Sequence, residues 1–303
     1  MESTKSIWMD GELVPWAEAK VHVLTHALHY GTGVFEGLRA YKNDDGTAVF
    51  RLREHMERLL ASAGSYAMPI EYSVDELVAA VRETIIDNEL ESCYIRPITF
   101  YETGTIGLNP AGARLTTSII AFPWGAYLGE EGLLNGIRVK ISSWARISPQ
   151  SFPAAKATGP YINSVLANQD AVREGYDEAL LLTADGNVSE GAGENLFLMN
   201  DGQVITPPLS DGCLAGITRQ SVMTLLTDDG YTIVEKSILP ADLFEADELF
   251  FTGTAAEVTP VREVDDREIG SGKPGPITRR AQELFTDAVG GKLEQYREWL
   301  TYI

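Results

Sequence analysis

Residues 178–206 read "EALLLTADGNVSEGAGENLFLMNDGQVIT" and indicate the type of sheet in the second half of the chain. The short runs "EALLLT", "NLFLM" and "QVIT" have the length and composition of strands. Asp185-Gly186 and Asp201-Gly202 are typical tight turns, so neighbouring strands connect directly. Parallel strands need long crossovers, and the stretch therefore predicts an antiparallel or mixed sheet rather than a doubly wound parallel one.

The flanking sequence continues this mixture of strands and helices. In the second half we expect strands at 136–143, 231–237 and 247–252, and helices near 161–174, 218–229 and 276–289. The first half predicts a hairpin at 7–16 around Asp10-Gly11, helices at 53–67 and 73–89, and strands at 93–100 and 115–122. Ser73 and Glu76 form a capping box at the start of the second of these helices.

The domain organisation follows from a break in periodicity. Residues 123–135 contain glycines and a proline, which is typical of a linker. We expect a small α/β domain at 1–122, an interdomain linker at 123–135 and a larger domain at 136–303. The length of 303 residues agrees with about two domains.

Composition excludes several classes of protein. Hydrophobic residues make up 44% of the chain, and no apolar run approaches the roughly 18 residues of a membrane helix. The N-terminus lacks the features of a secretory signal and the two cysteines form no CxxC pair, so a soluble, cytoplasmic protein is expected. A net charge of −20 argues against nucleic acid as a partner. The acidic excess favours simple solubility, with adaptation to salt as the alternative.

Lys156 is a candidate nucleophile. It lies in "SFPAAKATGPYINSV" (151–165) with no acidic residue within five positions on either side. A buried amine has a lowered pKa and can react with a carbonyl carbon. A surface lysine that happens to lack acidic neighbours is an equally good interpretation of the spacing.

Glu190 and Glu194 lie among small residues in "VSEGAGENLF" (188–197), where a ligand could approach the backbone closely. A nucleotide-binding GxGxxG loop is a weak interpretation, because the third glycine is absent and the segment lies between two strands. Taken alone, the segment favours a glycine bulge in a strand with a solvated glutamate.

Two segments suggest an anion site. Gly216, Ile217 and Thr218 begin an amphipathic helix, and a second group, Gly253, Thr254 and Ala255, follows a strand. Unpaired amides at a helix start, beside a hydroxyl, suit a phosphate, although Thr218 could equally be a plain N-cap. Arg58 on the first helix offers a cation, with a solvated arginine as the alternative.

The strand at 93–100 places Tyr94, Arg96 and Ile98 on one face, where Arg96 could bind a carboxylate. Pro97 predicts an edge strand, on which Arg96 would be an exposed charge instead. His22, His26 and His29 lie close together, but no cysteine or carboxylate cluster completes a metal site, so structural hydrogen bonds are expected and no metal.

Together these segments resemble the branched-chain amino acid aminotransferases, which belong to the fold type IV enzymes that use pyridoxal 5′-phosphate (PLP). The resemblance is nearly full-length and rests on motifs in the family's order: "HALHYGTGVFEGLRAY" (26–41), "REHMERL" (53–59), "YIRP" (94–97), "FPWGAYLG" (122–129), the lysine segment, "SEGAGENLF" (189–197), "GITR" (216–219) and "GTAAEVTPV" (253–261). It implies an α+β (mixed α/β) fold, with a small α/β domain and a larger PLP-binding domain that has a mixed or antiparallel, barrel-like sheet.

The resemblance also implies the cofactor site. Lys156 would bind PLP covalently and move the proton between the substrate and the cofactor. Glu190 would face the pyridine nitrogen, and Tyr161 would hydrogen-bond the phenolic oxygen. The remaining cofactor-binding residues would be Arg58, Leu214, Gly216, Ile217, Thr218 and Thr254.

For the substrate, the resemblance implies one pocket that accepts both an apolar side chain and glutamate. The substrate-binding residues would be Tyr30, Phe35, Arg39, Tyr94, Arg96, Leu108, Trp124, Tyr127, Thr254 and Ala255. In the family, the residues that match Tyr30 and Leu108 come from the neighbouring subunit, so at least a homodimer is expected.

The implied reaction is transamination between leucine, isoleucine or valine and 2-oxoglutarate. Thr158, Pro160 and Leu108 depart from the common pattern beside the pocket. They motivate an alternative, a relaxed transaminase that also accepts (R)-amines or D-amino acids. A non-catalytic binding protein is a further alternative, disfavoured because Lys156, Glu190 and Arg58 are all present.

Overall fold

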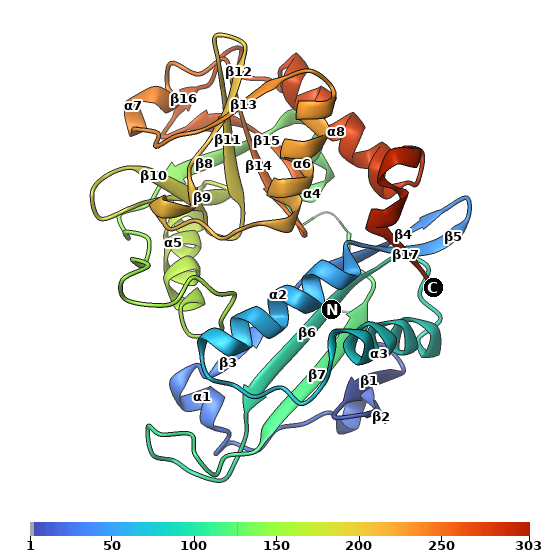
Figure 1. The fold of residues 1–303 in the computed structure, drawn as a ribbon. Coiled ribbons are helices and arrows are strands. Elements are labelled where there is room, and N and C mark those ends of the chain that lie inside the picture. The colour runs from blue at the N-terminus through green and yellow to red at the C-terminus, as the bar shows by residue number, and fades with distance from the viewer. Residues whose placement is uncertain (1–2, 126) are drawn as a thin grey trace. The chain divides into compact units, whose positions relative to one another are not determined.

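A computed structural model describes residues 3–125 and 127–303 and divides the chain into two compact units (Figure 1). The first unit comprises Met1–Trp124, Pro153–Tyr161 and Ala288–Ile303, and the second comprises Gly125–Phe152 and Ile162–Asp287. The expected division at 123–135 differs, because the chain returns to the first unit twice. Local sequence carries no signal for the pairings that cause this, Val34 with Ala157 and Leu300 with Phe50.

The expected linker is also shorter than its composition suggested. Helix α4 (Gly129–Asn135) occupies its second half and packs against the sheet of the second unit. Gly132 is buried on this helix, where a Cβ atom would lie 2.9 Å from a methyl group of Ile137. Ala126, within the expected linker, lies outside the described residues.

The first unit contains an antiparallel sheet with the strand order β17-β5-β4-β6-β7-β1-β2, and β3 also pairs with β6. Its described strands are β1 (Ser6–Met9), β2 (Glu12–Pro15), β3 (Gly33–Phe35), β4 (Leu38–Asn43), β5 (Gly46–Phe50), β6 (Cys93–Tyr101), β7 (Leu115–Phe122) and β17 (Leu300–Tyr302). The predicted hairpin at 7–16 is confirmed as β1 and β2.

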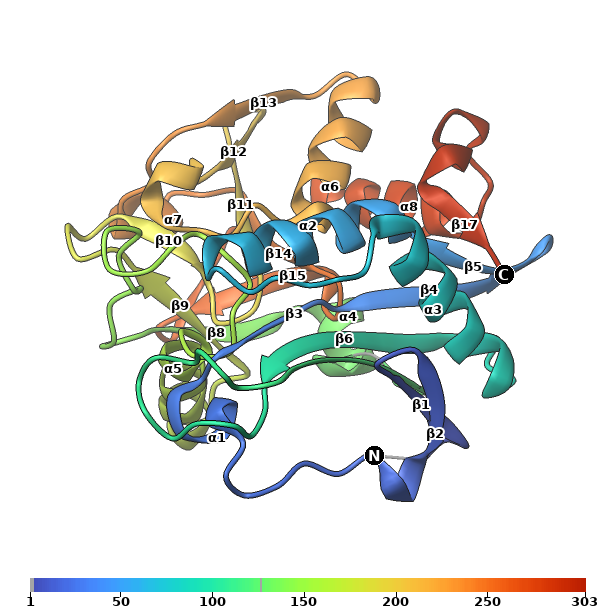
Figure 2. The same ribbon diagram turned by 60° about the horizontal axis from the view of Figure 1, so that its bottom comes forward.

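Two helices bury their apolar faces against one side of this sheet. They are α2 (Leu52–Ser65), which packs on β3, and α3 (Val74–Asp87), which packs on β1 and β7 (Figure 2). Met56 and Leu59 of α2 and Val81 of α3 are fully buried in one core with Ile95 and Ile119 of the sheet. The predicted capping box of α3 is confirmed. Shorter helical segments of this unit are η1 (Trp16–Glu18), α1 (His26–Tyr30) and η3 (Glu294–Trp299).

The prediction that Pro97 marks an edge strand is wrong, because β6 lies between β7 on one side and β3 and β4 on the other. Phe35 pairs with Ile98 and Leu38 pairs with Ile95, so Pro97 faces the gap between the ends of β3 and β4. The amide of Glu36 crosses this gap and donates to the Pro97 carbonyl at 2.8 Å. A missing N–H is therefore tolerated here inside the sheet.

The second unit contains the predicted mixed sheet, in the order β10-β9-β8-β15-β14-β11-β12-β13, with β16 paired to β15. Its described strands are β8 (Ile137–Ile141), β9 (Glu178–Leu182), β10 (Val188–Gly191), β11 (Asn195–Asn200), β12 (Gln203–Thr206), β13 (Thr232–Glu235), β14 (Glu248–Gly253), β15 (Glu257–Val264) and β16 (Arg267–Glu268). Direct turns make β9–β10, β11–β12 and β14–β15 antiparallel, whereas β8 runs parallel to β9 and β15.

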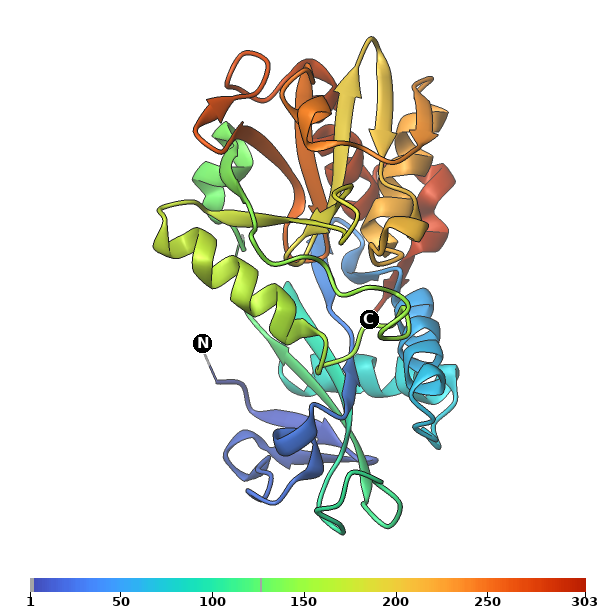
Figure 3. The same cartoon turned by 90° about the vertical axis from the view of Figure 1, so that its left-hand side faces the viewer.

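Helices cover this second sheet (Figure 3). They are α5 (Tyr161–Arg173), α6 (Ile217–Asp228), α7 (Pro240–Leu243) and α8 (Pro276–Val289), with a short turn η2 (Leu209–Asp211) before α6. Phe197 and Phe250, both fully buried, stack with ring centroids 5.0 Å apart. Among the described residues, no helix is long and apolar enough to cross a membrane.

Candidate active site

Lys156 is half-buried and has a defined hydroxyl partner. Its Nζ donates a hydrogen bond to Tyr161 Oη at 2.7 Å and lies 4.9 Å from the centroid of the Phe35 ring. No carboxylate of the described residues lies within ion-pair distance of this amine. The surroundings are therefore aromatic and free of acid, unlike those of a solvated surface lysine.

The backbone fixes the position of Lys156. Its carbonyl accepts a hydrogen bond from the Phe35 amide at 3.0 Å, and its own amide donates to Ser62 Oγ on α2 at 3.2 Å. The residues after Lys156 are held as well, because Thr158 Oγ1 donates to the carbonyls of Gly31 and Gly33. Lys156 thus lies in a segment, residues 156–158, that is hydrogen-bonded to β3 and α2; we call this segment the strap.

Arg58 of α2 is paired with Glu36, a residue that the sequence analysis did not identify. Glu36 is completely buried and accepts a two-pronged pair of hydrogen bonds from Arg58, Nε to Oε1 at 2.6 Å and Nη2 to Oε2 at 2.8 Å. His55 Nδ1 lies 2.7 Å from Glu36 Oε2. The alternative of a merely solvated Arg58 is therefore excluded.

The charges of this cluster follow from its burial. Burial raises the pKa of Glu36, but the Arg58 guanidinium and His55 outweigh it and hold that pKa well below the usual carboxyl range. Burial also lowers the pKa of His55, which Glu36 only partly offsets. The cluster therefore holds an ionised pair, Glu36 and Arg58, beside a neutral imidazole.

One sequence signal could have revealed Glu36. Val34, Glu36 and Leu38 alternate along the chain and share the face that packs against α2, where the other two are fully buried apolar residues. A charged residue at such a position needs a buried partner. Finding that partner on α2 required the tertiary structure.

The opposite face of the same strands carries the aromatic and cationic residues expected to bind substrate. Arg96 Nη2 donates to Tyr94 Oη at 2.9 Å, and the Arg96 guanidinium carbon lies 4.9 Å from the centroid of the Phe35 ring. Tyr94 contacts the edge of Trp124 at a centroid distance of 4.6 Å. Arg39 is opposite Tyr94 in the strand register. The predicted face of Tyr94 and Arg96 is confirmed, together with their contact.

A glycine is required beside this cluster. A Cβ atom on Gly37 would lie 2.1 Å from Tyr94 Oη, closer than any real contact. A cavity of about 630 Å³ adjoins Arg96 in this unit and is otherwise lined by apolar side chains: Ile7, Trp16, Ile120, Phe122, Pro123 and Trp124. Apolar walls with one cation suit a small molecule that has an apolar body and a carboxylate.

Tyr30 and Leu108 belong to a different cluster of the first unit. The side chain of Tyr30 is 41% exposed and that of Leu108 is 81% exposed. Tyr30 Oη donates to the Ile106 carbonyl, and His26 bridges Thr32 Oγ1 and the Gly107 carbonyl. These are the structural hydrogen bonds expected of the histidines. Among the described residues, no group of acids, histidines and cysteines could hold a metal ion.

In the second unit, Glu190 is buried and surrounded by donors. Leu214 N donates to Oε2 at 2.9 Å, Asn195 Nδ2 to Oε2 at 3.2 Å, and Arg146 Nη2 lies 2.6 Å from Oε1. A solvated glutamate is therefore wrong, although a β-bulge does occur between Val188 and Glu190. Neither Arg146 nor Asn195 was predicted as a partner of Glu190: Arg146 lies in no quoted motif, and Asn195 lies within "SEGAGENLF" without being singled out.

The start of α6 does not have Thr218 as its N-cap, which was one of the two interpretations of the sequence. Gly216 is the N-cap residue and no side chain caps the helix, so Thr218 is not the N-cap. A Cβ atom on Gly216 would lie 2.0 Å from Asn195 Oδ1, which only glycine avoids. Ile217 and Thr218 are buried in the first turn, where the helix amides lack a side-chain acceptor. This is a suitable site for a phosphate.

Three residues predicted to bind substrate or cofactor remain: Thr254, Ala255 and Tyr127. Thr254 and Ala255 form the turn between β14 and β15, and both are half-buried. Tyr127 is 43% exposed at the start of the second unit.

The donor set of each unit fits a part of PLP. Lys156 offers an amine beside a phenol, Arg58 a fixed guanidinium, Glu190 an ionisable carboxylate, and α6 an uncapped helix start. An aldehyde, a ring nitrogen and a phosphate are the groups that such donors bind.

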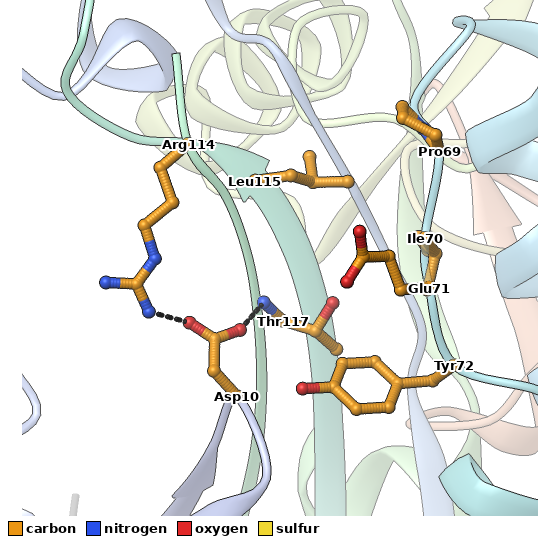
Figure 4. Close-up of a pocket in the computed structure, with 8 residues that line it drawn as sticks. All are labelled: Asp10, Pro69, Ile70, Glu71, Tyr72, Arg114, Leu115 and Thr117. Atoms are coloured by element: carbon orange, nitrogen blue, oxygen red, sulfur yellow. Dashed lines mark hydrogen bonds and ion pairs between the residues drawn. The ribbon is translucent and has the colours of Figure 1, made fainter. Parts of the chain in front are cut away.

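A second cavity of the first unit has different chemistry. It measures about 400 Å³ and is shown in Figure 4, lined by Asp10, Pro69, Ile70, Glu71, Tyr72, Arg114, Leu115 and Thr117. Asp10 accepts from the Arg114 guanidinium and from the Thr117 amide. No nucleophilic amine or thiol is among these lining residues, so the cavity offers no comparable catalytic group.

Comparisons with known proteins support the fold and the class of enzyme. Residues 33–264 match the family described as amino-transferase class IV. A protein of Pseudomonas aeruginosa named branched-chain-amino-acid aminotransferase is 50% identical over 298 residues, which cover 98% of this chain and 97% of that protein.

Solved structures agree with the described fold. The crystal structure of the Escherichia coli branched-chain amino acid aminotransferase has a TM-score of 0.96 at 47% identity and covers 98% of this chain and 99% of its own. The branched-chain aminotransferase of the archaeon Thermoproteus uzoniensis, solved with norvaline, has a TM-score of 0.94 at 46% identity and covers 99% of both chains. The predicted fold class is confirmed.

The buried pair of Glu36 and Arg58 predicts a pH-dependent stability. Near neutral pH, Glu36→Gln should lower the free energy of unfolding by about 3–5 kcal/mol, because it leaves Arg58 buried without its carboxylate. The pKa of Glu36 is lowered on folding, so its contribution is complete above 4.5 and is lost as the pH falls below that value. Urea denaturation followed by circular dichroism, at neutral and acid pH, measures both effects.

Glu91→Gln is the matched control, since Glu91 pairs with Lys42 at the surface of the same unit. This variant should lose less than about 1 kcal/mol. An unfolding free energy of Glu36→Gln equal to that of the wild type at neutral pH would contradict the prediction.

Proposed function

The chain belongs to the class IV aminotransferase family, with relatives named branched-chain-amino-acid aminotransferases, and from this membership we propose a PLP-dependent transamination of leucine, isoleucine and valine with 2-oxoglutarate. The observation that carries the proposal is the Lys156 amine, held by Tyr161 beside Phe35 and away from acids. PLP supplies, when bound, a ring that accepts the electrons released at the substrate α-carbon.

Lys156 acts on protons at its Nζ atom. It would hold the cofactor aldehyde at rest and, once substrate has taken its place, would move the proton between the substrate α-carbon and the cofactor. Tyr161 orients Nζ through the 2.7 Å hydrogen bond, and the strap to Phe35 and Ser62 fixes the lysine backbone. The rings of Phe35 and Tyr161 lie 4.9 and 5.1 Å from Nζ and cover part of the amine.

The other cofactor contacts divide by chemistry. Glu190, paired with Arg146, would face the ring nitrogen and favour its protonated form, while Leu214 and Asn195 hold its carboxylate in place. In the first unit, Arg58 is a candidate phosphate donor; in the second unit, the amides and hydroxyl at the start of α6 and Thr254 are candidate phosphate donors. Phosphate binding retains the cofactor while Lys156 is detached from it.

Substrate selection rests on the second face of the β3–β6 strands. Phe35, Trp124 and the apolar cavity beside Arg96 accept a branched side chain. In the first unit, Arg96 would bind the side-chain carboxylate of glutamate and Tyr94 the α-carboxylate. In the second unit, the amides of Thr254 and Ala255 are further candidates for the α-carboxylate. A branched-chain amino acid aminotransferase 44% identical to this chain, solved with N-(5′-phosphopyridoxyl)-L-glutamate, supports glutamate as the second amino acid.

The alternative of a relaxed transaminase finds no support in Thr158. Its hydroxyl donates to the carbonyls of Gly31 and Gly33, so it has a structural role in the strap. The comparisons name branched-chain aminotransferases and do not favour the alternative.

A second copy of the chain would complete the pocket. Tyr30 and Leu108 are exposed, and further exposed apolar side chains lie in the same segments: Val21, Val23, Leu24, Leu28 and Ile106. An apolar group of this kind is typical of a protein interface. We propose that Tyr30 and Leu108 reach the substrate pocket of the partner.

The role of Lys156 is tested by Lys156→Ala. Transamination of L-leucine with 2-oxoglutarate should fall by about 10²-fold or more, because the general acid and base is removed. The visible absorbance of lysine-bound cofactor, which shifts in the wild type on adding L-leucine, should be absent. Lys42→Ala, at the surface of the same unit, is the control. Unchanged turnover in Lys156→Ala would exclude the assigned chemistry.

Specificity is tested by a substrate scan with 2-oxoglutarate as acceptor, at low and high salt. L-Leucine, L-isoleucine and L-valine should be converted. D-Alanine and (R)-1-phenylethylamine should not, since the strap residue Thr158 is used structurally. Turnover of either compound at a rate near that of L-leucine would restore the relaxed alternative.

The assembly is tested by light scattering. The wild type should have the mass of at least two chains, and Leu108→Asp should shift it towards one chain, because a charge in an apolar interface is costly. Leu134→Asp, at an exposed leucine of the second unit, is the control. A wild-type mass of a single chain would exclude the shared pocket.

A further inference from the structure

We propose that Glu36 is a positioning residue that orients the Arg58 guanidinium towards the cofactor phosphate and couples it to the segment that carries Lys156. This inference rests on the proposed function, because it assigns a partner to a phosphate-binding arginine. It concerns a residue that lies within the motif at 26–41 but for which the sequence predicted no role.

The geometry of the pair fixes the plane of the guanidinium. Arg58 donates through Nε and Nη2 to the two oxygens of Glu36, at 2.6 and 2.8 Å. A two-pronged pair allows one orientation only, unlike a single hydrogen bond. The edge of the guanidinium away from Glu36 is therefore presented in one direction before any ligand binds.

His55 holds the carboxylate from a second side. Its Nδ1 lies 2.7 Å from Glu36 Oε2, and both side chains are buried. Burial keeps the imidazole neutral, so Nδ1–H donates to the ionised carboxylate without adding a charge. His55 and Arg58 lie one turn apart on α2, and the Gly37 amide also donates to Glu36 Oε2 at 3.3 Å, so the carboxylate cannot rotate without breaking a contact.

The backbone of the same segment reaches Lys156. The Phe35 amide donates to the Lys156 carbonyl at 3.0 Å, and Val34 pairs with Ala157. The Glu36 amide donates to the Pro97 carbonyl of β6. Three consecutive residues thus connect the lysine segment, the central strand and, through the Glu36 side chain, Arg58.

Charge alone does not explain the presence of Glu36. A carboxylate beside a phosphate-binding cation reduces the attraction for an anion, so a site built only for charge would lack it. A fixed arrangement of the donors compensates, because little side-chain freedom remains to be lost on binding. Glu36 therefore acts on the placement of Arg58 rather than on its charge.

The experiment compares two ligands that differ only in the phosphate. Purified protein is freed of cofactor and titrated with PLP or with pyridoxal, and the visible absorbance of the lysine-bound form is followed. Glu36→Gln should weaken PLP binding by about 10-fold or more, the size of effect that loss of an orienting partner has at metal ligands. Pyridoxal binding should change by less than about 2-fold, since it makes no contact with Arg58.

A second variant guards against loss of folding. Glu36→Asp keeps the charge but is one methylene too short for both prongs, and it should show the same selective loss of PLP affinity. Arg58→Lys shows how much PLP affinity is lost when the guanidinium itself is removed. Glu91→Gln, from the surface pair with Lys42, should bind PLP as the wild type does.

The outcomes separate this inference from the proposed function. Equal loss of PLP and pyridoxal affinity in Glu36→Asp, or unchanged or tighter PLP binding in both Glu36 variants, would overturn the positioning role. If the wild type itself bound pyridoxal as tightly as PLP, or failed to transaminate L-leucine, the proposed function would fail instead.

Discussion

The gap in the hydrogen-bond ladder opposite Pro97 is the constraint on which the first unit depends. It separates β3 from β4 while leaving both paired with β6, so the strand direction continues across residues 36 and 37. Alternation then places Glu36 on the face of α2 and Phe35 on the opposite face, beside Lys156. One short segment therefore organises chemistry on both sides of the sheet.

Each unit contains a buried carboxylate whose charge is stabilised by an arginine. Glu36 and Glu190 are buried carboxylates, and each is paired with an arginine and further donors. An isolated buried charge would cost far more than such a pair, so each group needs its full set of partners. The two differ in role, because Glu36 orients a side chain whereas Glu190 is proposed to act on the cofactor directly.

Sequence reasoning succeeded where the signal is local. The turns at Asp185-Gly186 and Asp201-Gly202, the capping box of α3 and the shared face of Tyr94 and Arg96 depend on a few neighbouring residues. Motif resemblance added the family and the identities of candidate residues, which spacing alone left open. The edge position of Pro97 was wrong because strand order is not a local property.

The sequence by itself determined many of the strands and helices, the family and the candidate lysine, since these depend on composition, periodicity and short motifs; it did not predict β3, β4, β5 or α4. Only the tertiary structure decided the return of residues 153–161 and 288–303 to the first unit, and the partners Glu36 for Arg58 and Arg146 for Glu190. Each of these contacts joins residues that are far apart in the chain. Burial makes each charged pair necessary, because a buried charge without a partner is costly, and this burial exists only once the chain has folded.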